Sequence, residues 1–187
     1  MKKFVNSLTV FRLLASPLIF ISLIYLDFKT LALILFLTAA ATDYFDGILA
    51  RSFDAESRFG EILDPIADKV LLVASLITII LYFESVYVGL ISLFLISREF
   101  WVSALRIASS SNGGDLSLKV TFLAKLKTTT QFIALSLYFF SISQNLAIGV
   151  LLSDFILFLS LGLSLKTALD YTKSFYLQLD MNEAKLK

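Results

Sequence analysis

Hydrophobic residues come in long runs along this chain, and short polar breaks separate the runs. About 20 consecutive apolar residues are needed for a helix to cross the hydrocarbon core of a bilayer. The pattern predicts an all-α integral membrane protein with six transmembrane helices. They lie near residues 8–26, 29–50, 61–83, 86–108, 120–142 and 146–166, in one domain spanning residues 1–187 with a polar cytoplasmic tail at about 170–187.

The basic residues predict the orientation of these helices. Of the 16 Lys and Arg residues, 15 fall on the side that holds both termini or near helix ends closest to it, and Lys29 falls on the other side. Because cytoplasmic loops carry an excess of Lys and Arg, the short N-terminal lead-in and both termini are expected to be cytoplasmic. The breaks on the opposite side are too short to hold a site. We therefore expect the functional site at the cytoplasmic face.

The composition excludes several kinds of site. The chain is 58% hydrophobic and only 17% charged, and it contains neither Cys nor His. Disulfides, zinc sites of the Cys and His type, and catalytic triads built on imidazole or thiolate are therefore excluded. Any metal must be bound by oxygen. The net charge of +1 gives no indication of a nucleic-acid partner. The basic, apolar N-terminus also fits a secretory signal, but the apolar runs that follow favour a first spanning helix.

Four carboxylates lie where the second and third predicted helices approach the cytoplasmic side, within "ATDYFDGILARSFDAESRFGEILDPIADKV" (residues 41–70). Asp43 and Asp46 are three residues apart on one helix, and Asp64 and Asp68 are four apart on the next. Residues at these spacings project from one face of a helix. The two helices are therefore expected to direct their carboxylates toward a common site.

A metal site is the simplest explanation of these four Asp residues. Ionised carboxylates repel one another in a low dielectric and are costly at membrane depth. A divalent cation removes both penalties, and oxygen ligands select magnesium, manganese or calcium. For Asp54, Glu56 and Glu61 we favour solvated charges. A divalent-cation transporter and a non-catalytic membrane scaffold are the alternatives to an enzyme, and neither accounts for the spacing as well.

The acidic pattern resembles the signature of the CDP-alcohol phosphatidyltransferase family, Asp-x2-Asp-Gly-x2-Ala-Arg-x8-Gly-x3-Asp-x3-Asp. The resemblance implies a membrane transferase whose four Asp residues bind a pair of Mg²⁺ or Mn²⁺ ions. It also implies that Asp68 is the general base, taking the proton from an attacking alcohol. Every specified position is filled: Asp43, Asp46, Gly47, Ala50, Arg51, Gly60, Asp64 and Asp68.

The resemblance also implies a nucleotide site. Small residues in the signature give a cytidine nucleotide close access to the helix, and the lead-in "NSLTVFR" is similar to the Asn-x-Leu-Thr-x-x-Arg of many family members. Capping of the first helix is the alternative explanation for Asn6 and Thr9. The nucleotide-binding residues implied are Asn6, Thr9, Gly47, Ala50, Arg51 and Gly60.

The segments "ISREFWVSALR" and "LAKLKTTTQ" resemble the branch of the family that uses sn-glycerol 3-phosphate, although Ala124 stands where Gly usually precedes the Lys. A dianionic phosphate needs a basic pocket. The structural alternatives are membrane anchoring for the lysines, contact with lipid headgroups for Arg106, and pairing with Glu99 or Asp154 for Arg98. The acceptor-binding residues implied are Arg98, Arg106, Lys125 and Lys127.

Taken together, the resemblance implies transfer of the phosphatidyl group from CDP-diacylglycerol to glycerol 3-phosphate, with release of CMP. The product, phosphatidylglycerol phosphate, stays among the membrane lipids. We expect a bacterial cytoplasmic (inner) membrane protein that forms a homodimer, as family members commonly do, and that binds no nucleic acid. The same chemistry with serine or inositol phosphate as acceptor is the nearest alternative.

Overall fold

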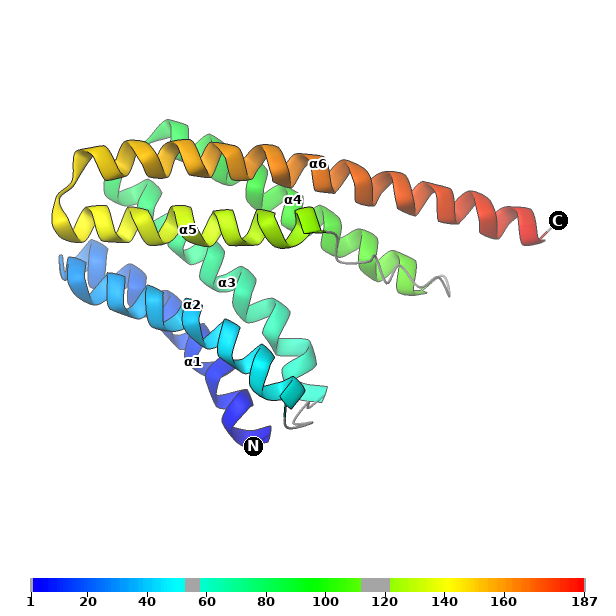
Figure 1. The fold of residues 1–187 in the computed structure, drawn as a ribbon, viewed down its shortest axis with the longest axis horizontal. Helices are drawn as coiled ribbons and strands as arrows, with labels where there is room; N and C mark the ends of the chain where they lie inside the picture. The colour runs from blue at the N-terminus through cyan, green and yellow to red at the C-terminus, as the bar shows by residue number, and fades with distance from the viewer. Residues whose placement is uncertain (1, 53–57, 112–121, 187) are drawn as a thin grey trace. The chain divides into compact units, whose positions relative to one another are not determined.

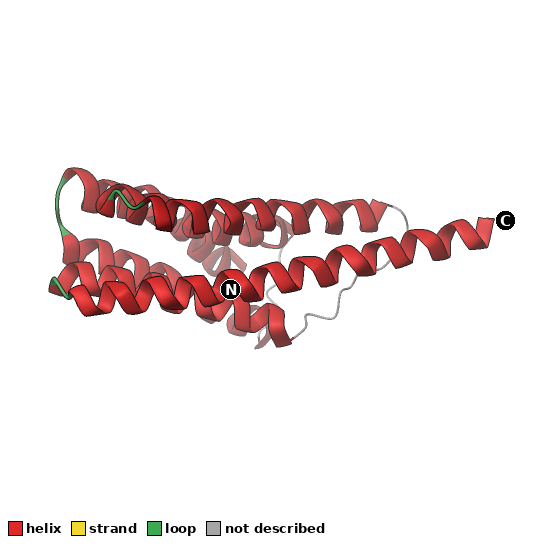
Figure 2. Ribbon diagram, turned by 90° about the horizontal axis from the view of Figure 1, so that it is seen from above, coloured by secondary structure: helices red, strands yellow, loops and turns green. Residues whose placement is uncertain are grey.

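The computed structural model describes the backbone of residues 2–52, 58–111 and 122–186 and the side chains of residues 6–42, 63–109 and 123–179. Within these ranges every regular element is a helix and no strand is present (Figure 2), which confirms the all-α prediction. The elements are α1 (Lys2–Phe20), the π-helix η1 (Ile21–Tyr25), α2 (Lys29–Ser52), α3 (Arg58–Phe83), α4 (Val86–Ser111), α5 (Phe122–Gln144) and α6 (Ala147–Leu186).

The observed helices match the six predicted runs, with differences at three ends. α1 begins at Lys2 and α3 at Arg58, each before the apolar run starts, and Pro65 lies inside α3. α6 continues to Leu186, 20 residues past the predicted membrane run. The reason is that residues 163–186 contain neither Gly nor Pro, and polar residues such as Lys and Gln favour a helix outside the membrane as well.

Four helical segments of the described chain are long and apolar enough to cross a membrane: Asn6–Ile24, Leu63–Phe83, Val86–Ser109 and Ala147–Leu179. Lys29–Thr42 forms a shorter apolar helix. Many large hydrophobic side chains on these helices are exposed, among them Leu14, Leu93 and Phe155. Exposed apolar surface on this scale is expected where lipid covers it. The chain is therefore an integral membrane protein, while the number of six spans stays a prediction.

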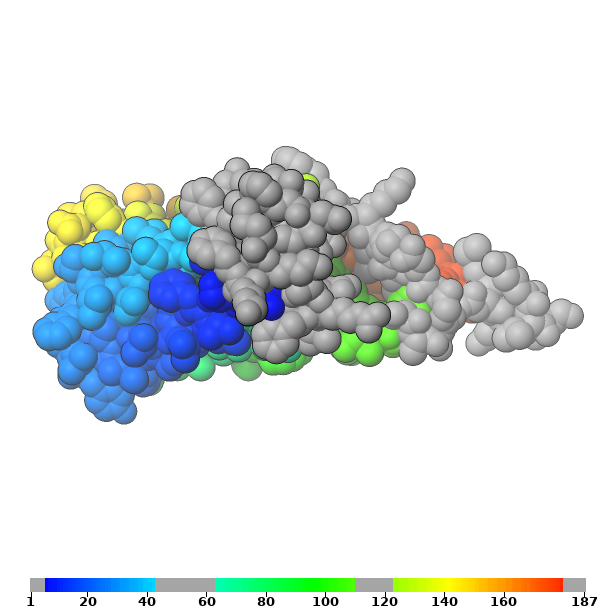
Figure 3. Space-filling view, turned by 90° about the horizontal axis from the view of Figure 1, so that it is seen from below, coloured from blue at the N-terminus to red at the C-terminus, as the bar shows by residue number. Residues whose placement is uncertain are grey.

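The chain divides into two compact units. Unit 1 comprises Met1–Gly89 and Phe132–Asp154, and unit 2 comprises Leu90–Gln131 and Phe155–Lys187. Within unit 1, α1 packs against α2 and α3, and Figure 1 shows α1 and α2 side by side. The described atoms of these two helices form a continuous surface in Figure 3. The prediction of a single domain is not tested by this division and stays a prediction.

Small side chains allow the helices of unit 1 to approach closely. Ala15, Ala32 and Ala67 are completely buried, as expected for helices that pack in a membrane, where small residues let backbones approach. Aromatic contacts fill the remaining space. The ring of Phe36 in α2 stacks on Phe139 in α5 at a centroid distance of 4.9 Å. This core fixes α1 beside the first half of α3, where two of the predicted site residues lie.

The three short turns of unit 1 gather at one end of that unit. Each turn contains one residue with a left-handed backbone: Asp27 (φ 51°), Glu84 (φ 49°) and Asn145 (φ 53°). Lys29 connects the turns, because its Nζ donates to Asn145 Oδ1 (3.0 Å) and lies 5.9 Å from the centroid of the Tyr82 ring. Helices joined by such short turns run antiparallel to their neighbours. The other ends of α2 and α3 therefore lie away from these turns.

Unit 2 has its own smaller core between α4 and α6. Val102 and Leu105 of α4 are buried against Tyr171 of α6, and Ala168 and Phe175 pack around them. A polar contact continues the same interface, because the indole N–H of Trp101 donates to Thr172 Oγ1 at 3.0 Å. These contacts hold α4 beside α6 along the stretch that carries Arg98 and Arg106.

Candidate functional site

Two of the predicted carboxylates, Asp64 and Asp68, project from one face of α3, as their spacing predicts. Their side chains are 36% and 39% exposed. Both contact the same guanidinium, that of Arg12 on α1: Nη1 of Arg12 donates to Asp68 Oδ1, and Nη2 lies 3.4 Å from Asp64 Oδ1. The shared contact shows that the two carboxylates face a common point.

Arg12 is the residue that holds this arrangement together. Its side chain is fully buried although it carries a permanent charge. A buried guanidinium requires anionic partners, because an isolated charge is very costly in an apolar environment. Its planar group presents donors in two directions and can contact two carboxylates at once. Arg12 therefore fixes both Asp side chains relative to α1.

Thr9 supports the same carboxylates from one turn earlier on α1. It is fully buried, and its hydroxyl donates a hydrogen bond to Asp64 Oδ1. Because α1 begins at Lys2, neither Asn6 nor Thr9 is at the helix start, and the capping alternative is wrong. Their assignment to the nucleotide stays a prediction. For Thr9 the structure adds a contact that the sequence did not indicate.

The remaining residues of the acidic signature belong to helices whose backbone is described but whose side chains lie outside the described part. These residues are Asp43, Asp46, Gly47, Ala50 and Arg51 near the end of α2 and Gly60 near the start of α3. Among the described side chains, which exclude Asp43 and Asp46, no three carboxylates come together as a metal site. The four-Asp metal site stays a prediction.

The described half of the acidic site fits a hard divalent cation. Asp64 and Asp68 offer carboxylate oxygens from one helix face, partly exposed and already oriented by Arg12. Oxygen donors of this kind suit Mg²⁺ or Mn²⁺. Counting only Arg12 and these two carboxylates, the formal charge is negative. A cation therefore suits this position better than an anion.

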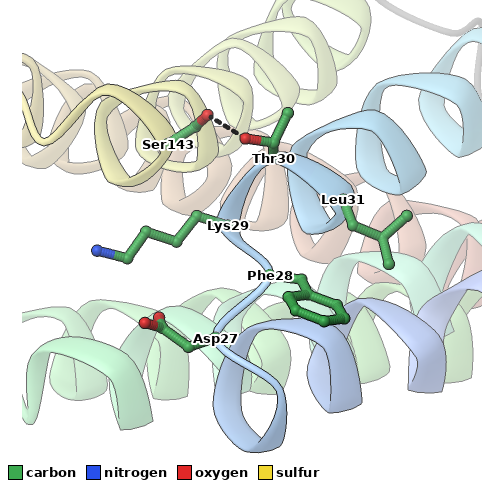
Figure 4. A pocket seen from close by; sticks show the side chains of 6 residues that line it. All are labelled: Asp27, Phe28, Lys29, Thr30, Leu31 and Ser143. Carbon is green, nitrogen blue, oxygen red and sulfur yellow. Dashed lines mark hydrogen bonds between the residues drawn. The ribbon is translucent and has the colours of Figure 1, made fainter.

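An open pocket of roughly 500 Å³ lies at the other end of unit 1, lined by Asp27 to Leu31 and Ser143 (Figure 4). Thr30 and Ser143 approach each other there, with hydroxyl oxygens 3.4 Å apart. Asp64 is 19 residues from the end of α3 at Phe83, which is about 28 Å along a helix. This pocket therefore belongs to the turns and not to the carboxylates.

Arg98 is the centre of a second ionic cluster, inside unit 2. The residue is 6% exposed, and its guanidinium is bound by α6 on two sides. Nε donates to the backbone oxygen of Ser164 (3.0 Å), and Nη2 donates to Thr167 Oγ1 (2.6 Å). These contacts orient the guanidinium firmly. A charged side chain this deep in a membrane helix marks a functional position by default.

Glu99 joins Arg98 to Lys127. Its Oε1 accepts a hydrogen bond from Arg98 Nη1 (2.7 Å) and another from Lys127 Nζ. Lys127, on α5, is only 7% exposed. The pairing of Arg98 with Glu99, considered as a structural alternative to phosphate binding, is thus present, and Glu99 also contacts a second cation. Two buried cations and one carboxylate leave this cluster with a positive formal charge.

The other two predicted acceptor residues differ from this buried pair. Lys125 is exposed, as expected for a residue two positions from a buried one on the same helix. Arg106 is also exposed and lies over the Tyr171 ring, 5.3 Å from its centroid. The structure therefore separates Arg98 and Lys127, which share one carboxylate, from Arg106 and Lys125, which do not contact it.

Asp154, which the sequence left without an explanation, has a partner in unit 1. The hydroxyl of Tyr138 on α5 donates a hydrogen bond to Asp154 Oδ1 on α6. Tyr138 is completely buried, so its hydroxyl needs an acceptor. The pairing of Arg98 with Asp154 considered from the sequence is replaced by pairing with Glu99. The Tyr138–Asp154 contact joins two helices and includes no cation.

Sequence reasoning missed the role of Arg12 and the contact of Glu99 with Lys127. Arg12 entered only as one of the basic residues that set the orientation. Its signal was present, because it ends the Asn-x-Leu-Thr-x-x-Arg motif three residues after Thr9, on the same helix face. Glu99 had a weaker signal, a carboxylate directly beside a deep Arg.

Comparisons with known proteins agree with these features. The sequence model of the CDP-alcohol phosphatidyltransferase family matches residues 3–165. A Wigglesworthia glossinidia brevipalpis protein named CDP-diacylglycerol–glycerol-3-phosphate 3-phosphatidyltransferase is 43% identical over 131 residues, covering 68% of this chain and 71% of the relative. Relatives of the same name from Sodalis glossinidius (40%, covering 68% and 71%) and Escherichia coli K12 (39%, covering 69% and 72%) are similar.

Proposed function

Because the chain belongs to the CDP-alcohol phosphatidyltransferase family, we propose that it transfers the phosphatidyl group of CDP-diacylglycerol to sn-glycerol 3-phosphate, releasing CMP and leaving phosphatidylglycerol phosphate in the bilayer. The relatives' names support this choice of substrates. The observation that carries the choice of acceptor is the buried pair Arg98 and Lys127, since two cations below a membrane surface suit a phosphate-bearing alcohol.

The donor half of the reaction is assigned to the acidic signature. Asp43, Asp46 and Asp64 would hold a pair of Mg²⁺ or Mn²⁺ ions, the type of ion on which the family generally depends, and Asp68 would complete the acidic site next to them. When bound, the ions supply charge neutralisation for the diphosphate and for the departing CMP. The chain's own contribution is orientation, because Arg12 and Thr9 fix the carboxylates of α3 before any substrate arrives.

Asp68 is proposed as the general base. Its carboxylate accepts the proton of the acceptor hydroxyl as that oxygen attacks the phosphorus that bears diacylglycerol. The bond from this phosphorus to the CMP oxygen then breaks. Arg12 holds Asp68 by one oxygen, which keeps the side chain in a single orientation. Such orientation is what a base needs to meet a hydroxyl at hydrogen-bond distance.

The nucleotide would lie against the small residues of α2, Gly47 and Ala50, with contributions from Arg51 and Gly60. Asn6 and Thr9 would contact it from α1. Because Thr9 already donates to Asp64, we propose that its effect on the nucleotide acts chiefly through that carboxylate. For Asn6 we propose direct contact with the cytosine or ribose.

We propose six transmembrane helices with both termini in the cytoplasm, in a bacterial inner membrane, with the chain acting as a homodimer. The basic residues support this orientation. Because the chain has no Cys, single-Cys variants test it directly. A membrane-impermeant thiol reagent added to intact cells should label Lys29→Cys and should not label Lys125→Cys. The reverse pattern would contradict the orientation.

The acceptor is tested with purified protein, CDP-diacylglycerol, and glycerol 3-phosphate, serine or inositol phosphate in separate reactions. We expect CMP release and phosphatidylglycerol phosphate with glycerol 3-phosphate alone. Product from serine, with none from glycerol 3-phosphate, would overturn the choice of acceptor while leaving the family chemistry in place. Metal flux into proteoliposomes that survives Asp68→Asn would instead support a transporter.

A further inference from the structure

One carboxylate oxygen binds two buried cations in unit 2. Oε1 of Glu99 accepts from Arg98 Nη1 and from Lys127 Nζ, and the three side chains are 18%, 5% and 9% exposed. An ion pair that serves only stability needs one partner for one charge. Here a second cation is brought to an oxygen that already has one, although like charges at short distance repel each other.

Arg98 differs from Glu99 in how it is held. Arg98 is fixed by the backbone oxygen of Ser164 and by the hydroxyl of Thr167, which itself donates to the same Ser164 oxygen (2.9 Å). Nη1 is then the part of the guanidinium that faces Glu99. The carboxylate, by contrast, is bound here through the cations themselves. Displacing it would leave Arg98 oriented.

A phosphate oxygen satisfies the same donors that Glu99 satisfies. Arg and Lys bind carboxylates and phosphates with similar geometry, and phosphate adds further oxygens and a second negative charge. A dianion that replaces Glu99 therefore gains attraction to both cations. A monoanion that replaces it exchanges one negative charge for another and gains little. The geometry thus favours doubly charged ligands.

We propose that Glu99 is a positioning residue that occupies the phosphate-binding position between Arg98 and Lys127, and that it is displaced when dianionic phosphate binds. The inference rests on the proposed function for the identity of the acceptor. Glu99 keeps the two cations together beforehand and excludes singly charged anions. By competing for this position, Glu99 lowers its apparent affinity for every anion. The affinity for monoanions falls more than the affinity for dianions, so the position becomes selective for dianions.

The first test compares Glu99→Gln, Glu99→Asp and Asp170→Asn with the wild type. Glu99→Gln keeps the shape and removes the competing charge, so the KM for glycerol 3-phosphate should fall about 5-fold with kcat changing less than threefold. Glu99→Asp retains the competing charge on a shorter side chain, so its KM for glycerol 3-phosphate should not fall below that of the wild type. Asp170, an exposed residue of α6, controls for the loss of one negative charge and should leave KM unchanged. An unchanged or higher KM in Glu99→Gln would overturn the proposal.

A second test uses the wild type alone and does not depend on any variant folding. Thermal melting is followed in sodium sulfate and in sodium nitrate at equal ionic strength and low millimolar concentration, where the general stabilising effect of sulfate is small. Both salts are also tested as competitors of glycerol 3-phosphate. Sulfate should raise Tm and compete, and nitrate should do neither. Equal effects of the two anions would contradict the proposal. Because the melting needs no substrate, it tests the anion site even if another acceptor proves to be the substrate.

Discussion

Among the described side chains, the two ionic clusters of this protein have opposite charge balances. In unit 1 one buried cation, Arg12, contacts two carboxylates, Asp64 and Asp68. In unit 2 one carboxylate, Glu99, contacts two buried cations, Arg98 and Lys127. Ion pairs that only stabilise a fold are best matched one to one, because excess charge in a low dielectric is costly. An unmatched cluster therefore indicates a ligand of the opposite sign.

The comparison assigns each cluster its own half of the reaction. The negative cluster suits metal ions, which neutralise the diphosphate of the donor lipid. The positive cluster suits the phosphate of the acceptor. In unit 1 the single cation, Arg12, orients the two carboxylates, whereas in unit 2 Glu99 lies between two cations, of which Arg98 is also held by α6. Substitutions of the outnumbered residues, Arg12 and Glu99, should therefore affect kinetics indirectly, through the groups that they contact. Substitutions of the carboxylates in unit 1 or of the cations in unit 2 should affect binding or chemistry directly.

The largest effect is expected for Asp68→Asn, which changes one of the two carboxylates that contact Arg12. The amide still accepts a hydrogen bond from Arg12 but cannot take a proton. We expect kcat to fall about 10³-fold, within the range of general-base losses, while the affinity for CDP-diacylglycerol stays within threefold. Steady-state kinetics and nucleotide titration measure the two quantities.

Asp43→Asn is the matched variant for this prediction, since it is proposed to lose metal and nucleotide affinity together. If Asp68→Asn lost as much nucleotide affinity as Asp43→Asn, Asp68 would belong to the metal ligands and not to the proton transfer.

The second largest effect is expected for Arg12→Lys, which changes the cation that contacts Asp64 and Asp68. A Lys ammonium is a point charge and cannot contact both carboxylates in the geometry of a guanidinium. We expect kcat/KM for CDP-diacylglycerol to fall about 30-fold, roughly 2 kcal/mol of transition-state stabilisation. The exposed Lys173 of α6 provides a control, because Lys173→Gln removes a basic residue that belongs to neither cluster. If Arg12→Lys had the kinetics of the wild type, Arg12 would only balance the charge of the carboxylates and would not be needed to orient them.

The third prediction compares Arg98, a buried cation of the positive cluster, with Lys125, an exposed cation outside it. Arg98→Ala removes a buried, oriented donor, and a hydrogen bond to a charged group contributes about 1.5–3 kcal/mol. The KM for glycerol 3-phosphate should therefore rise about 10–100-fold. Lys125→Ala, at an exposed position two residues from Lys127, should raise it less than threefold. Equal increases would mean that burial does not identify the acceptor site.

Much of the fold follows from the sequence because hydropathy and helix formation agree over most of the chain. The turns near Asp27, Glu84 and Asn145 were predicted closely, since the apolar run and the helix end together there. Hydropathy and helix formation disagree at the end of α6, where the residues stop being apolar but still favour a helix. Hydropathy reports where the membrane ends, and α6 continues to Leu186.

The site was predictable within helices and not between them. The spacing of Asp64 and Asp68 on one helix determined that they share a face. The contacts of Arg12, on a helix more than 50 residues earlier, depend on how α1 packs against α3, and no local pattern encodes that distance. The same limit applies to Glu99 and Lys127. Pairs of opposite charge between helices therefore needed the structure.

The smallest kinetic effect is expected at the Tyr138–Asp154 contact, which has no cation and so serves as the reference for the two clusters. Tyr138→Phe removes a donor from a carboxylate inside the membrane, at a cost of about 1.5–3 kcal/mol. For a chain of this size each kcal/mol shifts Tm by about 2–4 °C, so we expect Tm to fall by about 3–12 °C. Both KM values should stay within twofold of the wild type, because the contact joins α5 to α6 without excess charge. The exposed Tyr176 is the matched control, and Tyr176→Phe should change neither quantity. A changed KM for glycerol 3-phosphate with an unchanged Tm would place Asp154 among the substrate-binding residues, and charge excess would then no longer distinguish functional clusters from structural ones.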